Sequence, residues 1–212
     1  MLRRTFLISA PLVMAGCATT NSVWAPDSAI NAAIFRGTGP KSLTLYTMRN
    51  TGSGNGAHSS LVINASQRVL FDPAGSFWNS QIPERNDLLF GISPQIEDYY
   101  VSFHARQTYY VEGQKVLVPI DVAEKALQIA QTYGPVGQGR CTRAVSTILS
   151  YLHGFETIRS TFFPNTLRDQ FQTLPGVTLT QYREPDSDDK SIAAKQIDSA
   201  LKASQKQAGH RK

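Results

Sequence analysis

The sequence predicts an α+β fold in which an antiparallel sheet packs against a few helices. Two observations predict it. Segments rich in β-branched and aromatic residues, separated by short turn-forming stretches, come first, and segments with helical spacing of apolar residues come later. Residues 25–182 contain both kinds of segment and are numerous enough to bury a hydrophobic core. We therefore expect one domain over residues 25–182, between two ends of different composition.

Strand-forming residues dominate the first half of the domain. Residues 58–64 and 68–72 flank Ala-Ser-Gln, a stretch that can turn the chain, so we expect these two strands to form a hairpin. A loop dense in glycine, serine and asparagine, residues 51–57, precedes this hairpin. A long aromatic segment, residues 99–111, predicts a strand with a bend, followed by a turn at Glu-Gly-Gln. Further strands are predicted at 42–47, 115–119 and 177–182.

Helical spacing begins after the predicted strand at 115–119. Asp121 is a candidate N-cap with Glu124 three residues later, as in a capping box, and Gly134 and Pro135 can end this helix. A second amphipathic helix begins at Cys141, whose side chain lies on the same face as the apolar residues of that helix. A third helix is predicted around Pro164, a residue suited to a helix start.

The N-terminus resembles a bacterial lipoprotein signal. Residues 1–16 combine two arginines with a short apolar run that ends in small residues, and Cys17 follows. The resemblance implies cleavage before Cys17, acylation of its thiol and a lipidated linker over residues 17–24. An ordinary signal peptide or an anchor helix is the alternative. Because Ala18 rather than aspartate follows the cysteine, the resemblance also implies a bacterial cell-envelope protein, anchored by lipid in the outer membrane and facing the periplasm.

The C-terminus, residues 183–212, is polar and rich in lysine. It predicts a mobile tail with one frayed helix, whose weak apolar pattern consists of Ile192, Ile197 and Leu201. Such a tail could touch anionic lipid or cell wall, or could simply be solvated. The full chain has a formal net charge of +5, and loss of Arg3 and Arg4 with the signal leaves +3. This mild charge, without a groove rich in arginine and aromatic residues, argues against nucleic-acid binding.

Cys141 has features of a reactive thiol. If Cys17 is acylated, Cys141 has no partner for a disulfide within the chain. The positive end of a helix dipole stabilises a thiolate, and backbone N–H groups at the same helix start can hold an oxyanion. Nearby glycines would let a substrate approach, and Arg140 and Arg143 would add positive potential. The alternative is a core cysteine that happens to begin a helix.

A reactive cysteine needs a base, and the chain has four histidines. His58 opens a predicted strand directly after the glycine-rich loop, and Asp72 ends the partner strand at the same end of the hairpin. Asp72 could therefore orient the imidazole of His58, or could simply cap the turn before Pro73. His104 is expected in mid-strand among tyrosines. His153 is too far along its helix from Cys141, and His210 belongs to the tail.

The order of these segments resembles one protein group. AHSSLVI, RVLFDPAG and GRCTRAVSTIL follow one another as in the circularly permuted papain-like proteins, relatives of the NlpC peptidases and of lecithin–retinol acyltransferase. The resemblance covers residues 42–152 and implies a permuted papain-like fold. It also implies Cys141 as nucleophile, His58 as general base and Asp72 as the orienting residue. In that group the residue that orients the general base, here Asp72, is often a histidine. Gln138 is near enough to Cys141 to be considered as an oxyanion donor.

These observations together predict a lipid-anchored thiol hydrolase or acyltransferase acting on an amide or ester through a thioester intermediate. Its location makes peptidoglycan peptides the first substrate class to consider and acyl groups the second. A catalytically inert papain-like binding or scaffolding lipoprotein is the main alternative. A redox protein is disfavoured because no resolving cysteine is present. No cofactor is predicted, and the spacing of the histidines and the thiol does not match a zinc site.

Overall fold

The structure, a computed structural model, describes residues 23–209, with side chains as far as residue 202. The expected signal segment, residues 1–16, and the expected lipidation site, Cys17, lie outside this range. Among the described residues, no helix is long and apolar enough to cross a bilayer. The elements are α1 (Asp27–Ala33), β1 (Ser42–Asn50), β2 (Gly56–Asn64), β3 (Arg68–Phe71), β4 (Glu84–Arg85), β5 (Leu88–Phe90), α2 (Pro94–His104), β6 (Tyr109–Leu117), α3 (Ile120–Thr132), α4 (Cys141–Ser150), α5 (Pro164–Gln172), β7 (Thr178–Tyr182) and α6 (Lys190–Gly209).

The seven strands form one sheet in the order β4-β5-β3-β2-β1-β6-β7, and every neighbouring pair is antiparallel. The α+β class with an antiparallel sheet is therefore confirmed. The hairpin expected from residues 58–72 is also present, because Leu61 pairs with Phe71 and Asn64 pairs with Arg68. Its register fixes which residues of β2 and β3 face each side of the sheet.

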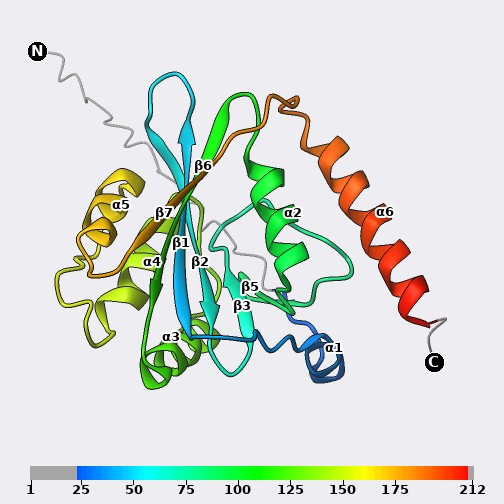
Figure 1. The fold of residues 1–212 in the computed structure, drawn as a ribbon, viewed down its shortest axis with the longest axis horizontal. Helices are drawn as coiled ribbons and strands as arrows, with labels where there is room; N and C mark the ends of the chain where they lie inside the picture. Colours follow the sequence, from blue (N-terminus) through cyan, green and yellow to red (C-terminus); the bar gives the residue numbers. More distant parts are fainter. Residues whose placement is uncertain (1–22, 210–212) are drawn as a thin grey trace, which may run out of the picture.

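Helices cover both faces of the sheet (Figure 1). Alternate residues of β2 enter different cores: Leu61 and Ile63 pack with α3, α4 and α5, whereas Val62 packs with α2 and α6. This alternation follows from the two-residue period of a strand. Leu61 and Ile63 have no exposed surface, and burying such a side chain contributes about 1.5–3 kcal/mol to stability. The central strands are thus buried on both faces.

The prediction of a strand over residues 99–111 is wrong for its first part. Residues 94–104 form α2, which begins with Pro94 after an N-cap, Ser93, whose hydroxyl accepts a hydrogen bond from the Ile96 backbone N–H. Tyr100, Val101 and His104 are buried at helical spacing. Tertiary packing has overridden the strand propensity of these aromatic and β-branched residues. His104 consequently lies at the end of a helix rather than in mid-strand.

The turn predicted at Glu-Gly-Gln is also wrong, because β6 runs without interruption through Gly113. A Cβ atom at this position would lie 2.8 Å from the Tyr46 ring and 2.9 Å from the Thr180 hydroxyl oxygen. Gly113 therefore allows a close approach between neighbouring strands and does not mark a turn.

The capping box predicted for the helix after residue 119 is absent. Helix α3 begins at Ile120 without a side-chain cap. The Glu124 carboxylate instead accepts hydrogen bonds from the Ser66 backbone N–H and hydroxyl. Glu124 thus holds the turn between β2 and β3 against α3. The predicted helix starts at Cys141 and Pro164 are present as α4 and α5.

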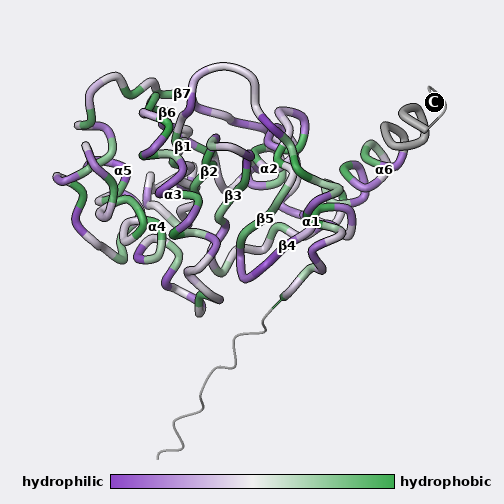
Figure 2. Tube along the Cα trace, turned by 90° about the horizontal axis from the view of Figure 1, so that it is seen from below, coloured by the Kyte–Doolittle hydropathy of each residue, from purple (hydrophilic) through white to green (hydrophobic). Residues whose placement is uncertain are grey.

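The C-terminal region, expected as a mobile tail over residues 183–212, contains the long helix α6. Ala193, Ile197 and Leu201 lie at four-residue spacing on α6 and are buried in the core beside α2. Ile192, which the sequence pattern placed on the apolar face, is 48% exposed. Figure 2 shows that α6 alternates hydrophobic and hydrophilic residues and lies at one end of the molecule. A helix in this region is thus present, and Ile197 and Leu201 of its expected apolar pattern are buried in a core that also contains residues of α2; such packing stabilises an amphipathic helix.

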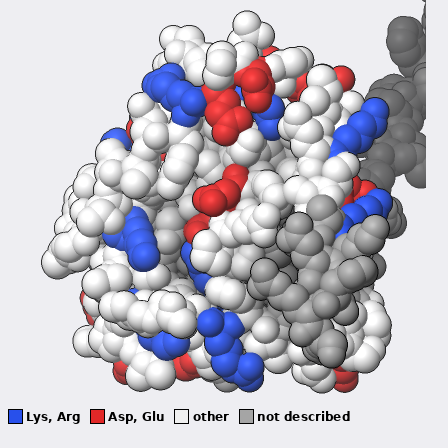
Figure 3. Space-filling model, turned by 45° about the vertical axis from the view of Figure 1, so that its right-hand side comes forward, with Lys and Arg blue, Asp and Glu red and all other residues white. Residues whose placement is uncertain are grey.

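Charged side chains of both signs are interspersed on the face drawn in Figure 3. On the part of this face that the described residues form, acidic groups lie at the centre and at the top, and basic groups lie among and around them.

Candidate active site

The hairpin of β2 and β3 brings His58 and Asp72 together, as the sequence predicts. Nε2 of His58 lies 2.7 Å from Oδ1 of Asp72. The Asp72 side chain is only 2% exposed and that of His58 is 16% exposed, so this contact is largely shielded from water. Because Asp72 occupies Nε2, Nδ1 is the ring nitrogen left to face another group.

Asp72 is held by more than His58. The Tyr100 hydroxyl donates a hydrogen bond to Oδ1 of Asp72 over 2.7 Å and lies 2.7 Å from the Ser60 hydroxyl oxygen. Burial raises the pKa of Asp72, but the positive charge and hydrogen bond of His58 outweigh it and leave the pKa below its usual value. A Cβ atom at Gly75 would lie 1.9 Å from Oδ2 of Asp72, so the loop after β3 can wrap the carboxylate only with glycine at this position.

Cys141 is the first residue of α4 and is a free, half-buried thiol. Burial raises the pKa of Cys141, but the hydrogen bond and charge of His58, with a hydrogen bond from the Ser59 backbone, lower it to about 7. The pKa of His58 changes in the opposite direction. Burial lowers it, and the charge and hydrogen bond of Asp72, followed by those of Cys141, raise it to about 10. Between these values the pair exists as a thiolate and an imidazolium.

Two adjacent residues of β2, His58 and Ser59, have side chains on opposite faces of the sheet. Ser59 faces α4, because its hydroxyl lies 3.0 Å from the hydroxyl of Thr142. His58 faces α2, where its ring stacks on that of His104 with a centroid separation of 6.2 Å. Successive side chains of a strand point to opposite sides, so one strand positions both His58 and the helix that carries the Cys141 thiol.

The start of α4 offers donors for an oxyanion. No side chain caps this helix, and its first turn therefore presents backbone N–H groups beside the thiol. Gly139 precedes it with a φ of 74°, a left-handed conformation that favours glycine. Gln138 and Gly139 line the same cavity as Cys141. The arrangement is suited to stabilising negative charge on a carbonyl oxygen that is attacked by the thiol.

His104 is a residue of the site that sequence reasoning did not place there. Nδ1 of His104 donates to the Tyr100 carbonyl oxygen over 2.9 Å. Burial lowers the pKa of His104 to about 4, so the ring is neutral at pH 7. The signal that could have found it is its spacing from Tyr100, since residues four apart share a helix face once the segment is treated as a helix.

Arg140 and Arg143 do not have the position expected from the sequence. Both line a separate hollow of about 210 Å³ rather than the cavity that Cys141 lines. The guanidinium of Arg143 lies over the Phe162 ring, 5.0 Å from its centroid. The cation that lowers the pKa of Cys141 is therefore His58 rather than an arginine. His153 is exposed and pairs with Glu156, and His210 lies outside the described residues.

A cavity of about 500 Å³ contains His58 and Cys141. Its other walls come from the loop after β3, from the segment between α2 and β6, and from the segment before α6. His104 at the end of α2, Arg106 after it and Lys190 at the start of α6 also line the cavity. The volume is within the range of small-molecule sites.

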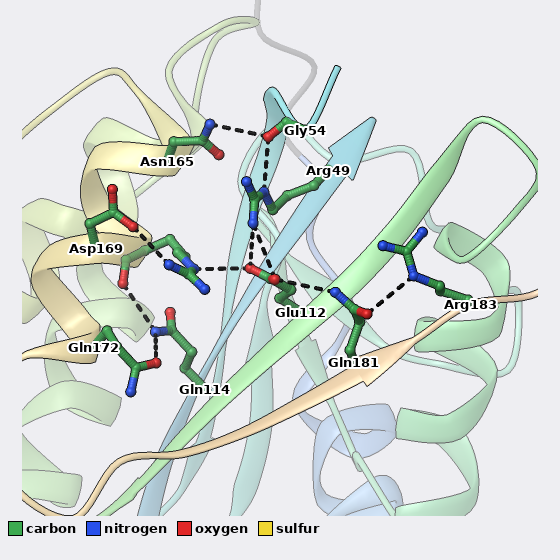
Figure 4. Close-up of polar contacts among 10 residues, drawn as sticks. Arg49, Gly54, Glu112, Gln114, Asn165, Asp169, Gln172, Gln181 and Arg183 are labelled. Atoms are coloured by element: carbon green, nitrogen blue, oxygen red, sulfur yellow. Dashed lines mark hydrogen bonds and ion pairs between the residues drawn. The ribbon is translucent and has the colours of Figure 1, made fainter. Parts of the chain in front are cut away.

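A buried polar network supports the strands next to the site (Figure 4). Glu112 of β6 is 4% exposed and accepts hydrogen bonds from Arg49 of β1 over 3.1 Å and from Arg168 of α5 over 3.0 Å. Asn165 at the start of α5 donates to the Gly54 carbonyl in the loop before β2. The network fixes α5 against the loop that leads into β2, so it stabilises the strand that carries His58.

Comparison of this chain with protein-family models, with curated protein sequences and with solved structures gives no significant match. Within the described residues, the Cys141 thiol at the start of α4 and the His58 imidazole line one cavity, and the buried Asp72 carboxylate contacts Nε2 of His58.

Proposed function

We propose that this chain is a thiol hydrolase or acyltransferase that acts on an amide or an ester. Cys141 is the nucleophile, His58 the general base and acid, and Asp72 the residue that orients and charges His58. The observation that carries this proposal is the contact of 2.7 Å between His58 and Asp72, in a cavity that His58 shares with Cys141.

The reaction follows from the protonation states of the pair. The Cys141 thiolate attacks the substrate carbonyl carbon, and the carbonyl electron pair moves to oxygen, where N–H groups at the start of α4 stabilise it. Collapse of this intermediate forms a thioester and expels an amine or alcohol, which takes its proton from the His58 imidazolium. His58, now neutral, removes a proton from water or another acceptor. That acceptor attacks the thioester, releases the acyl product and restores the thiolate.

We propose that the fold is of the circularly permuted papain-like type. Support comes from the chain order of the site: histidine on β2, the acidic residue after β3, and cysteine at the start of α4. An antiparallel sheet with helices on both faces is compatible with this arrangement.

The N-terminal pattern supports an envelope location, with acylated Cys17 holding the domain at the periplasmic side of the outer membrane. Two or more acyl chains give stable anchoring, whereas one gives only marginal binding. In that location the first candidate substrates are peptidoglycan peptides, and lipid or lipoprotein acyl groups are the second.

The test is the pH dependence of Cys141 alkylation by iodoacetamide on the folded chain. We expect the alkylation rate to rise with a midpoint near pH 7, and we expect this midpoint to move toward 9.0, the ordinary value for the thiol, in His58→Ala. Cys141→Ser identifies the thiol that reacts, and Lys195→Met serves as a surface control. An ordinary midpoint that His58→Ala leaves unchanged would contradict the proposal and would favour an inert binding protein.

A further inference from the structure

One wall of the cavity is made by the segment between β7 and α6. Its acidic residues are tied to α2 and to the loop that follows α2. Glu184 accepts a hydrogen bond from the Ser102 hydroxyl over 2.9 Å, and Asp188 accepts one from the Thr108 backbone N–H over 2.9 Å. Asp186 pairs with Arg106 over 3.2 Å. These contacts hold the segment in a defined position next to the cavity, rather than as a solvated tail.

The guanidinium group of Arg106 has more N–H donors than it has acceptors among the described residues. A guanidinium group has five N–H donors. Of those on Arg106, only Nη1 has an acceptor among the described residues, namely Asp186, and Nε is buried without a partner. The residue is only 5% exposed and lines the cavity. Burial of a cation is costly unless its donors are satisfied, so a buried arginine with free donors at a cavity wall favours an anionic ligand.

Lys190 adds a second cation to the same wall. Its ammonium group donates to the Ser76 hydroxyl over 2.9 Å and lies 4.8 Å from the centroid of the Phe103 ring. Asp188 also lines the cavity, but each of its oxygens is engaged with Thr108. The two cations are therefore the groups of this wall that have donors to offer to a ligand.

We propose that Arg106 and Lys190 bind a carboxylate of the substrate while Cys141 attacks its carbonyl carbon. The inference rests on the proposed function and narrows its substrate class to acyl compounds that carry a carboxylate near the scissile bond, such as a peptide with a terminal or side-chain carboxylate. A planar carboxylate can accept two parallel hydrogen bonds from a guanidinium group, and the adjacent ammonium supplies a further charge.

The first test uses alkylating reagents that differ only in charge. Bromoacetyl-glycine and bromoacetyl-β-alanine carry a carboxylate at two distances from the reactive carbon, and their amides are neutral controls with the same reactive group. We expect the acids to alkylate Cys141 faster than the amides. The ratio of rates should fall about tenfold in Lys190→Met, the effect of losing one charged hydrogen bond. The exposed substitution Lys195→Met should leave the ratio unchanged.

The second test does not depend on the reactivity of the thiol. In proton–nitrogen correlation spectra of the full chain, the Nε–H signal of Arg106 should shift with N-acetylglycine and not with N-acetylglycinamide. Inorganic phosphate is the competing probe, and a shift with phosphate alone would overturn the carboxylate assignment.

The two readouts separate this inference from the proposed function. Slow alkylation of Cys141 by the neutral amides, with the pH midpoint of an ordinary thiol, would contradict catalysis by Cys141. The spectral test would then decide on its own whether the carboxylate site exists. A reactive thiol with equal rates for acids and amides, and no shift of the Arg106 signal, would overturn the inference and leave the catalytic proposal intact.

Discussion

Asp72→Asn is the substitution that tests the charge of the site with the least change in shape. Asp72 makes the largest contribution that raises the pKa of His58 from 6.5 to about 10, a change that corresponds to about 5 kcal/mol. With asparagine in its place, burial dominates and His58 is neutral at pH 7. Cys141 then loses the imidazolium that lowers its pKa from 9.0 to about 7.

The size of the effect on alkylation can be worked out from these values. A return of the Cys141 pKa from about 7 to 9.0 reduces the thiolate fraction at pH 7 by about fiftyfold. The more basic thiolate is intrinsically more nucleophilic, by about sixfold to tenfold over two pKa units. We therefore expect the alkylation rate at pH 7 to fall about fivefold to eightfold, and its midpoint to move to about pH 9.

We expect Asp72→Asn to reduce the rate of turnover far more than the rate of alkylation. Asparagine can favour the wrong tautomer of the histidine, and the corresponding change in a serine protease reduces kcat by about 10⁴. The assay is iodoacetamide alkylation across pH, with Asp98→Asn as a control, because Asp98 is an exposed carboxylate on α2, the helix that also carries Tyr100. A midpoint that stays near pH 7 in Asp72→Asn, or that moves equally in Asp98→Asn, would refute the reasoning.

Three further predictions concern stability. In the folded protein Cys141 releases its proton near pH 7 and His58 keeps its proton until about pH 10, so the pair adds almost no pH dependence to the free energy of unfolding between pH 7 and 9. In Cys141→Ser only the raised pKa of His58 remains. Chemical denaturation of this variant should therefore show a free energy of unfolding that falls as pH rises through this window. Gly75→Ala should place a Cβ against Asp72, lower the unfolding free energy by about 1–3 kcal/mol and raise the alkylation midpoint, whereas Gly52→Ala, which meets only an ordinary contact of 3.5 Å, should do neither. Glu112→Gln should lower the unfolding free energy by about 3–5 kcal/mol, because Arg49 and Arg168 lose their shared carboxylate, and an equal loss in the exposed control Glu156→Gln would contradict this explanation.

The parts of the fold and site that the sequence predicts correctly depend on local patterns. The hairpin that joins His58 to Asp72 follows from two alternating segments around a short turn, and its register fixes which ends meet. The start of α4 at Cys141 follows from a glycine-rich loop and an amphipathic period. Each of these features is decided within a few residues, so the sequence carries enough information to predict it.

The features that were missed depend on contacts between distant segments. The aromatic residues of α2 have a strand propensity, but as a helix they pack in one core with residues of the sheet and of α6, and Tyr100 donates a hydrogen bond to Asp72. The apolar face of α6 has few members, and its burial depends on α2 being a helix. The expectation of a strand over residues 99–111 placed His104 in mid-strand, whereas in the structure His104 ends α2 and lines the cavity that contains Cys141.

Helix α2 links the chemistry of the site to its proposed recognition of substrate. Tyr100 on this helix donates to the carboxylate that charges His58, and Ser102 holds the segment that leads to Lys190. The proposed nucleophile, Cys141, and the proposed base, His58, come from α4 and β2 and line the same cavity. A substrate held between the two walls would have its carbonyl carbon at the thiolate and its carboxylate at the cations. On these proposals the thiol lies on α4 and Lys190 lies at the start of α6, so we expect changes in the C-terminal segment to alter the preferred substrate without altering the acidity of Cys141.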